Sequence, residues 1–209
     1  YMFIKEYYPE KYEILKNYIA QGRWMPAGGS VDANDVMVPS AESIIRNFLY
    51  GQHFFMQEFG VRGGRDIMLP DCFGFPHSLP TLGKHCGRDV FHTAKLAWGS
   101  SDYGKLQNYQ RWRGVDGSEI LGIFKSSPYD NHNGYLKDLA YDSDLIREAT
   151  NNKNNLGVPT VFRYIGPVGD QGGAVPDANG EWMEVSLASD GPLKVHLTSP
   201  TAFYESFTP

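Results

Sequence analysis

Cysteine is scarce in this 209-residue sequence, which contains only Cys72 and Cys86. Two cysteines at this spacing form neither a disulfide framework nor a cysteine zinc pattern, so we interpret both as small buried hydrophobic residues. The six histidines are equally dispersed, and no two of them stand in an HxH or HxxxH arrangement. The spacing of cysteine and histidine therefore predicts no metal site.

Long apolar runs and an excess of basic charge are also missing. No stretch approaches the roughly 18 consecutive apolar residues of a membrane-spanning helix. Acidic residues outnumber basic ones, 24 to 19, which gives a formal net charge of −5. This balance argues against nucleic acid as the main partner, because phosphate binding relies on a basic surface. An initiator methionine and a signal peptide are absent as well, and we expect the chain to be a piece of a longer protein.

Aromatic residues, in contrast, are abundant, at 14% of the sequence. They suit an ordinary hydrophobic core and also a cleft that binds sugars. Hydrophobic residues make up 41% and charged residues 21%, the balance of a folded globular domain. The composition thus predicts a globular fold and leaves the function open.

Helical and strand-like segments alternate along the chain. Apolar residues at three- and four-residue steps, together with capping residues, predict helices over 5–21, 40–59, 78–85, 136–150 and 198–207. Short apolar runs predict strands over 66–69, 89–93 and 119–124, and residues 158–165 look extended. We expect 151–155 to end the fourth helix and 166–192 to be irregular. This alternation predicts an α/β fold built around a parallel sheet.

Three candidate reactive positions follow the predicted strands, where active sites of parallel α/β folds gather. Asp71 comes after the first strand, although an Asp there can also be a simple helix cap. Lys95 comes after the second; beside a carboxylate it would lower the carboxylate pKa, whereas the alternative is a solvated surface lysine. Tyr129 and Asp130 come after the third, in a segment that could equally be an ordinary turn.

Several blocks of the sequence, taken together in order and spacing, resemble glycoside hydrolase family 38, the α-mannosidases. The central block is MLPDCFGF at 68–75. The other blocks are WMPAGG at 24–29, PSAESIIR at 39–46, LYGQHFF at 49–55, TAKLAW at 93–98 and WRGVDGSEIL at 112–121. The resemblance implies that 1–209 is part of a single N-terminal catalytic domain. The implied fold is an irregular seven-stranded β/α barrel of the glycoside hydrolase/deacetylase type, incomplete in this chain.

The resemblance also implies roles for individual residues. Asp71 corresponds to the catalytic nucleophile and to one ligand of a zinc ion, Zn2+. Phe73 corresponds to a ring that packs beside the bound sugar, and Lys95 to a cation that contacts the nucleophile. Tyr129 and Asp130 correspond, less directly, to contacts with substrate hydroxyl groups. The family's other zinc ligands and its general acid/base fall outside 1–209.

The resemblance therefore implies zinc-dependent, retaining hydrolysis of terminal α-mannosidic bonds in a mannose-containing glycan. A metal-dependent polysaccharide deacetylase, on a related barrel, is an alternative, although its His-x-x-x-His ligand pair is missing here. A non-catalytic glycan-binding relative is another. The similarity to bacterial members, which are often exported, favours the periplasm or the exterior of the cell.

Overall fold

A four-stranded open sheet lies at the centre of the computed structural model, which describes residues 1–97, 107–124, 136–165 and 175–207. The strand order is β1-β2-β4-β3. Strands β1 (Asp66–Met68), β2 (Val90–His92) and β4 (Glu119–Ile123) run parallel, as the sequence predicts. The described residues thus form a mixed α/β fold, and the irregular seven-stranded barrel, incomplete in this chain, stays a prediction.

Strand β3 (Tyr109–Arg113) is the element that the sequence analysis missed, and it makes the sheet mixed instead of purely parallel. It pairs antiparallel with β4, with Tyr109 opposite Ile123 and Trp112 opposite Ile120. Its sequence, YQRWR, carries too few apolar residues to indicate a strand on its own. It forms because the turn at Gly117, where φ is +86°, folds it back onto β4.

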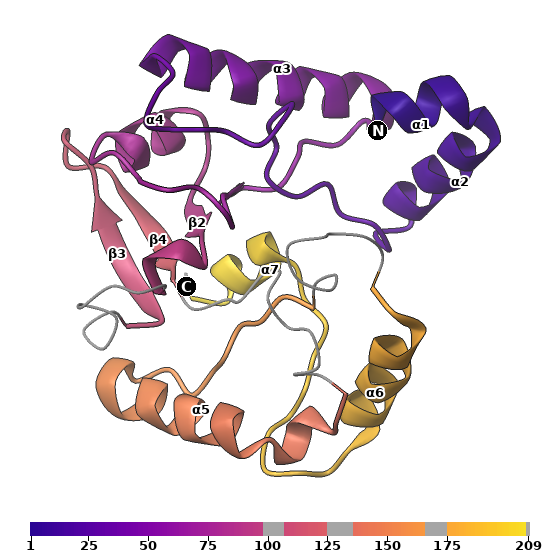
Figure 1. The fold of residues 1–209 in the computed structure, drawn as a ribbon, viewed down its shortest axis with the longest axis vertical. Coiled ribbons are helices and arrows are strands. Elements are labelled where there is room, and N and C mark those ends of the chain that lie inside the picture. The colour runs from indigo at the N-terminus through magenta and orange to yellow at the C-terminus, as the bar shows by residue number, and fades with distance from the viewer. Residues whose placement is uncertain (98–106, 125–135, 166–174, 208–209) are drawn as a thin grey trace.

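Hydrophobic cores cover both faces of the sheet, whose strands and neighbouring helices are labelled in Figure 1. On one face, helices α3 (Ala41–Phe59) and α4 (Leu79–His85) pack over Ile67 and Phe91. On the other face, Phe203 of α7 (Pro200–Glu205) and Phe162 pack against Val90. The two layers leave the carboxyl ends of β1, β2 and β4 at one edge of the sheet.

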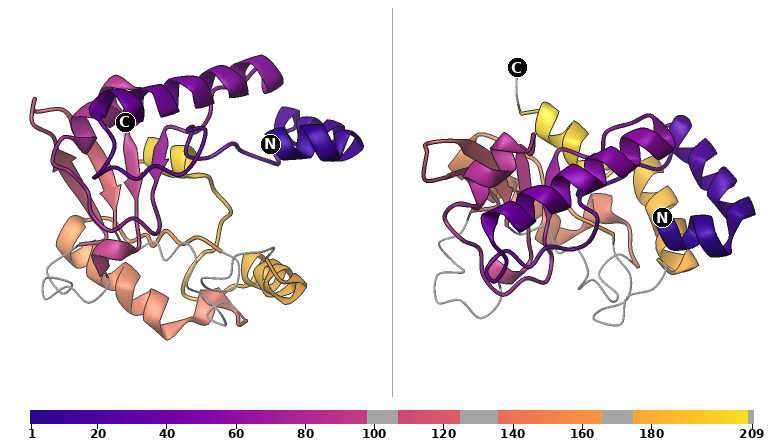
Figure 2. Two further views of the ribbon diagram at one scale, coloured as in Figure 1. Left: turned by 45° about the horizontal axis from the view of Figure 1, so that its top comes forward. Right: turned by 90° about the horizontal axis from the view of Figure 1, so that it is seen from above.

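The first predicted helix is divided in the structure. It consists of α1 (Met2–Tyr7) and α2 (Pro9–Ala20), which lie together beyond one end of α3 (Figure 2). The division falls at Pro9, because proline has no N–H to donate and disfavours a helical conformation at the residue before it. The apolar steps in this segment predict a buried stripe of Tyr8, Tyr12, Leu15, Tyr18 and Ile19. Tyr12, Leu15 and Ile19 are buried, whereas Tyr8 and Tyr18 are exposed.

Helix α3 begins and ends where the sequence predicts. Ser40 caps it by accepting a hydrogen bond from the Ser43 backbone N–H, and Gly60 ends it with φ of +67°. The sequence predicts a buried stripe of Ile45, Phe48, Leu49, Phe55, Met56 and Phe59. Phe48 and Phe55 are buried, but Ile44 is buried in place of Ile45, and Leu49 and Met56 are exposed, so the buried face is rotated. Within the described part of the chain, no helix is long and apolar enough to cross a membrane.

Gly51 explains why α3 can lie so close to the loop that precedes it. A Cβ atom at this position would lie 2.5 Å from the carbonyl oxygen of Gly29 and 2.6 Å from the carbonyl carbon of Ser30. These are backbone atoms, which cannot swing aside as a side chain can. The side chain of Gln52 also donates a hydrogen bond to the Gly29 carbonyl oxygen, 3.0 Å away, and so holds the loop against the helix.

The second half of the chain departs furthest from the predictions. A short 3-10 turn, η3 (Leu139–Tyr141), precedes α5 (Ser143–Leu156), so the predicted helix starts late and is not ended by residues 151–155. Asn152 is buried and donates to the Thr160 carbonyl oxygen at 2.8 Å, which ties the last turns to the following segment. Residues 158–165 belong to no described strand. Helix α6 (Asp177–Ala188) occupies part of the segment predicted to be irregular, and α7 confirms the last predicted helix.

Candidate active site

Asp71 and Lys95 meet at the carboxyl edge of the sheet, although 24 positions separate them in the sequence. Asp71 follows β1 and Lys95 begins the 3-10 turn η1 (Lys95–Ala97) after β2. The Lys95 Nζ atom lies 2.5 Å from Asp71 Oδ1. Neighbouring parallel strands bring the two residues together, because the carboxyl ends of such strands share one edge.

Lys95 is not the solvated surface lysine that the sequence left as an alternative. Its side chain is only 10% exposed, whereas that of Asp71 is 57% exposed. An ammonium group removed from water needs a charged or polar partner, and the Asp71 carboxylate provides one. The cation in turn favours the ionised form of the carboxylate, which still faces solvent and can meet a ligand.

Two further residues complete the surroundings of this ion pair. Phe73 is 87% exposed, and Lys95 Nζ lies 5.1 Å from the centre of its ring, within the range of a cation–π contact. Thr93 is fully buried, and its Oγ1 accepts a hydrogen bond from the Lys95 backbone N–H at 3.1 Å. Thr93 thus fixes the turn that carries Lys95, and Phe73 presents an open aromatic face beside the charges.

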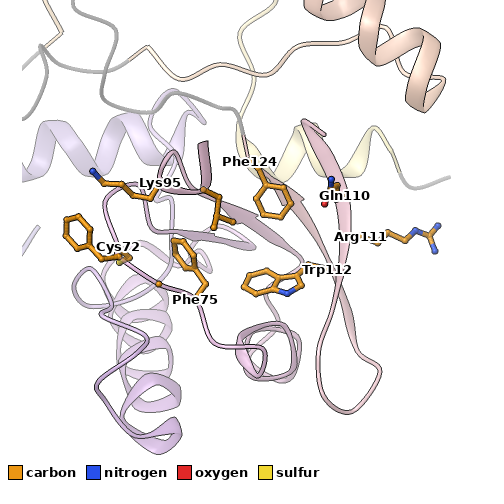
Figure 3. A pocket seen from close by; sticks show the side chains of 10 residues that line it. Cys72, Phe75, Lys95, Gln110, Arg111, Trp112 and Phe124 are labelled. Atoms are coloured by element: carbon orange, nitrogen blue, oxygen red, sulfur yellow. The ribbon is translucent and has the colours of Figure 1, made fainter. Parts of the chain in front are cut away.

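A pocket of about 610 Å³ adjoins the ion pair. We call it the aromatic pocket; it is lined by Cys72, Phe73, Gly74, Phe75, Lys95, Leu96, Gln110, Arg111, Trp112 and Phe124. In Figure 3 the rings of Phe75, Trp112 and Phe124 surround the pocket, and the Arg111 side chain points away from them. Its size lies within the range of ordinary small-molecule sites.

The structure brings together some of the predicted site residues and leaves others untested. It places Asp71, Phe73 and Lys95 side by side, whereas Tyr129 and Asp130 lie outside the described residues. Sequence reasoning missed Gln110 as a pocket residue. Only recognition of β3 could have found it, because alternation along that strand puts Gln110 and Trp112 on one face.

His92 is a buried titratable residue on β2 that does not line the aromatic pocket. It is fully buried on β2, and the rings of Phe162 and Tyr164 lie with their centres 5.4 Å from its own. Neither ring nitrogen has a hydrogen-bond partner among the described residues. Burial lowers the pKa of His92 to about 3, so the imidazole is neutral at ordinary pH.

The two cysteines are free thiols, as expected, but they are only half-buried. Both pack against the core beneath α3 and α4. Cys72 Sγ donates a hydrogen bond to the Asn34 carbonyl oxygen at 2.9 Å. Burial raises the pKa of each thiol, which keeps them protonated and argues against a nucleophilic role.

Zinc would need more ligands than the described residues provide. No group of three or more His, Cys, Asp or Glu side chains with metal-binding geometry occurs in the part of the chain that the structure describes. Zinc sites in proteins use at least three protein ligands. Asp71 alone therefore does not make a zinc site, and any complete site needs ligands from outside these residues.

Comparisons with known proteins identify the family of this chain. The family model described as "Glycosyl hydrolases family 38 N-terminal domain" matches residues 1–208. Alpha-mannosidase G of Dictyostelium discoideum is 33% identical over all of this chain, and alpha-mannosidase 2C1 of Mus musculus is 30% identical over 95% of it. The chain spans 18% of the length of each of these relatives.

A solved structure shows the same fold. The crystal structure of an alpha-mannosidase from Enterococcus faecalis V583 matches 97% of this chain, and the chain covers 22% of that structure. The TM-score is 0.66 and the sequence identity 17%, so this likeness concerns the fold alone. Together with the match to the family model, it leads to one conclusion: the chain belongs to glycosyl hydrolase family 38 and is part of the family's N-terminal domain.

Proposed function

We propose that the complete protein hydrolyses terminal α-mannosidic bonds in mannose-containing glycans, with Asp71 as the nucleophile. The single observation that supports this role most strongly is the ion pair between an exposed Asp71 and an almost buried Lys95, in a chain of this family. A nucleophilic carboxylate must be both ionised and accessible. The neighbouring Lys95 cation favours the ionised form of Asp71, and the 57% exposure of the Asp71 side chain leaves it accessible.

In the proposed reaction the Asp71 carboxylate attacks the anomeric carbon of the terminal sugar while a second carboxyl group protonates the leaving oxygen. A retaining mechanism of this kind places the two carboxyl groups about 5 Å apart. Water, activated by the same second carboxyl group, then attacks the anomeric carbon, which releases mannose and regenerates the Asp71 carboxylate. Lys95 stabilises the charge of Asp71 before the first attack and again as the carboxylate leaves. Phe73 lies against the apolar side of the sugar ring.

The remaining parts of the proposal rest on the family resemblance. They are zinc, held by Asp71 and by ligands outside this chain, and substrate hydroxyl contacts from Tyr129 and Asp130. A seven-stranded barrel, of which 1–209 is a part, would complete the catalytic domain. The described residues do not complete a metal site, so zinc would depend on ligands from elsewhere in the complete protein.

A polysaccharide deacetylase and a non-catalytic glycan-binding protein are the two competing functions. A deacetylase would use a carboxylate to activate water and would release acetate, with no change in the length of the glycan. A glycan-binding relative would release nothing. The Asp71–Lys95 pair favours hydrolysis over simple binding, since binding a neutral sugar needs no ionised carboxylate beside a desolvated cation.

The products separate these functions. The complete protein is incubated with an α-linked mannobiose, with the corresponding β-linked sugar and with an acetylated polysaccharide, and the products are followed by proton NMR. We expect mannose only from the α-linked sugar, released first as the α-anomer. Release of acetate, of the β-anomer, or of nothing would contradict the proposal.

A further inference from the structure

We propose that the aromatic pocket binds a second sugar ring of the same glycan, on the leaving-group side of the bond that is cleaved. This inference rests on the proposed function and extends it to the substrate beyond the terminal residue. An enzyme that removes terminal sugars holds the remainder of the glycan entirely on the leaving side. A second sugar site in such an enzyme must therefore accept the leaving part.

The pocket is continuous with the proposed catalytic residues. Phe73 and Lys95 belong to its lining, and the same Lys95 ammonium lies 2.5 Å from the Asp71 carboxylate. Cys72 and Phe73 directly follow Asp71 in the chain and also line the pocket. A glycan whose terminal sugar lies at Asp71 therefore has its next ring within reach of this pocket.

Apolar surface in the pocket comes from aromatic rings of separate elements (Figure 3). Phe75 follows β1, Phe124 follows β4, and Trp112 lies on β3. Phe91 packs against Trp112 at 5.0 Å between ring centres and holds the indole in place. Large, fixed aromatic faces of this kind suit the C–H surfaces of a pyranose ring.

Polar groups with unused hydrogen-bonding capacity lie on the same wall. Gln110 and Trp112 stand two positions apart on β3 and so share one face. The described residues offer no hydrogen-bond partner to the Gln110 amide or to the Trp112 indole N–H. An amide that donates and accepts, next to an indole that donates, matches the hydroxyl groups of a sugar.

The charges around the pocket favour a neutral ligand. The Lys95 ammonium is already paired with Asp71, and the Arg111 guanidinium lies 3.5 Å from Glu119 and points away from the pocket (Figure 3). An anionic or cationic ligand would thus find no available opposite charge among the described lining residues. A neutral hexose needs none.

The pocket floor depends on a glycine. Gly122 lies opposite Gln110 in the sheet, and the Phe124 ring folds back over it. A Cβ atom at Gly122 would lie 2.3 Å from Cζ of Phe124, so any side chain there would push the ring out of its position. The lack of a side chain at Gly122 therefore shapes this floor.

Kinetics of the complete protein test the inference with two substrates. Methyl α-mannoside has a leaving group too small to fill the pocket, whereas the preferred member of a panel of α-linked mannobioses places a second ring there. The variants are Trp112→Leu and Gln110→Met, and the second keeps the test valid if loss of the indole unfolds the sheet. Matched controls are Trp182→Leu on α6 and Gln57→Met on α3, whose parent side chains are exposed and lie outside the pocket.

We expect each pocket variant to lower kcat/KM for the mannobiose by about three- to tenfold, the size of one lost contact. We expect kcat/KM for methyl α-mannoside to change less than about twofold, and both controls to leave both substrates within that range. An equal fall for both substrates, or no fall for either, would overturn the second-sugar site while the proposed function stands. A wild-type protein that cleaves no mannoside would overturn the proposed function and this site with it.

Discussion

Lys95 and Asp71 form a close ion pair in which the cation is almost buried and the carboxylate is exposed. This asymmetry separates their roles. Thr93 fixes the backbone of Lys95 by accepting a hydrogen bond from its N–H, and the Phe73 ring lies beneath the Lys95 ammonium. The carboxylate, in contrast, faces the solvent from which a substrate arrives.

Loss of the Asp71 charge should abolish activity and preserve the fold. We expect Asp71→Asn in the complete protein to lower kcat for an aryl α-mannoside by several orders of magnitude, because an amide cannot attack the anomeric carbon. Asp190→Asn, which removes an exposed carboxylate elsewhere, is the matched control. If Asp71 were only a helix cap, its loss would lower stability by about 1 kcal/mol and spare the activity.

Lys95 should act mainly on the reaction and less on binding. We expect Lys95→Met to lower kcat more than it raises KM, because the cation acts on a charge that changes as the bond to the sugar forms and breaks. Lys95→Arg should retain more activity, although a guanidinium fits a site built for an ammonium imperfectly. Steady-state kinetics measure both effects, and a change in KM alone would assign Lys95 to substrate binding.

Close backbone packing at Gly51 should reverse the usual effect of alanine in a helix. Alanine is normally favoured over glycine there by about 0.5–1 kcal/mol. At Gly51 the new Cβ would meet the backbone of Gly29 and Ser30, and we expect Gly51→Ala to lower the free energy of unfolding by about 1–3 kcal/mol. Urea unfolding measures the change.

Gly180 on α6 provides the control for this experiment. A Cβ atom there would meet nothing within 4 Å. We expect Gly180→Ala to raise the free energy of unfolding by about 0.5–1 kcal/mol, as alanine does in an open helical position. If Gly51→Ala also stabilised the protein, the close contact between α3 and the preceding loop would be refuted.

Much of the fold can be predicted from the sequence, because apolar runs and capping residues occur where the structure has buried strands and helix ends. The three parallel strands are short apolar runs, and Ser40 and Gly60 mark the ends of α3 by their capping chemistry. The edge strand β3 could not be predicted this way. Arg111 and Arg113 face outward on it and pair with Glu119 across the sheet, a contact that exists only after folding.

The candidate site was partly predictable, because some of its residues directly follow strands that the sequence indicates. Asp71 and Lys95 were identified because each follows a predicted strand. The alternation of strands with helices predicts a parallel sheet, in which the ends of those strands share one edge. Gln110 could not be identified, since its approach to the pocket depends on the antiparallel return of β3. Helix α6 was missed because Gly180 lies inside it and Pro176 precedes it, two residues that usually indicate loops.

Burial of His92 predicts a loss of stability in acid. Its pKa is about 3 in the folded protein, against 6.5 for an unperturbed histidine. The unfolded chain therefore binds a proton below pH 6.5 that the folded chain does not accept until about pH 3. The stability that the neutral ring contributes is complete above pH 6.5 and falls by about 1.4 kcal/mol for each pH unit below it.

A leucine at this position removes the titration. We expect the difference in unfolding free energy between the wild type and His92→Leu to shift in favour of the variant as the pH falls from 7.5 to 4.5. His53→Leu, which replaces a histidine at an exposed position on α3, is the matched control. Urea unfolding across this pH range measures the shift, and a difference that stays constant with pH would contradict a buried, neutral His92.

The central claim is that Asp71 forms a covalent bond to the sugar, and trapping that bond tests it most directly. The complete protein is incubated with a fluorinated α-mannosyl fluoride, in which the ring fluorine slows breakdown of the covalent intermediate, and is then digested and analysed by mass spectrometry. We predict that the peptide containing Asp71 gains the mass of one fluoromannosyl group and that fragmentation assigns the group to Asp71. A label on a different carboxylate in an enzyme inactivated by the reagent would contradict the account.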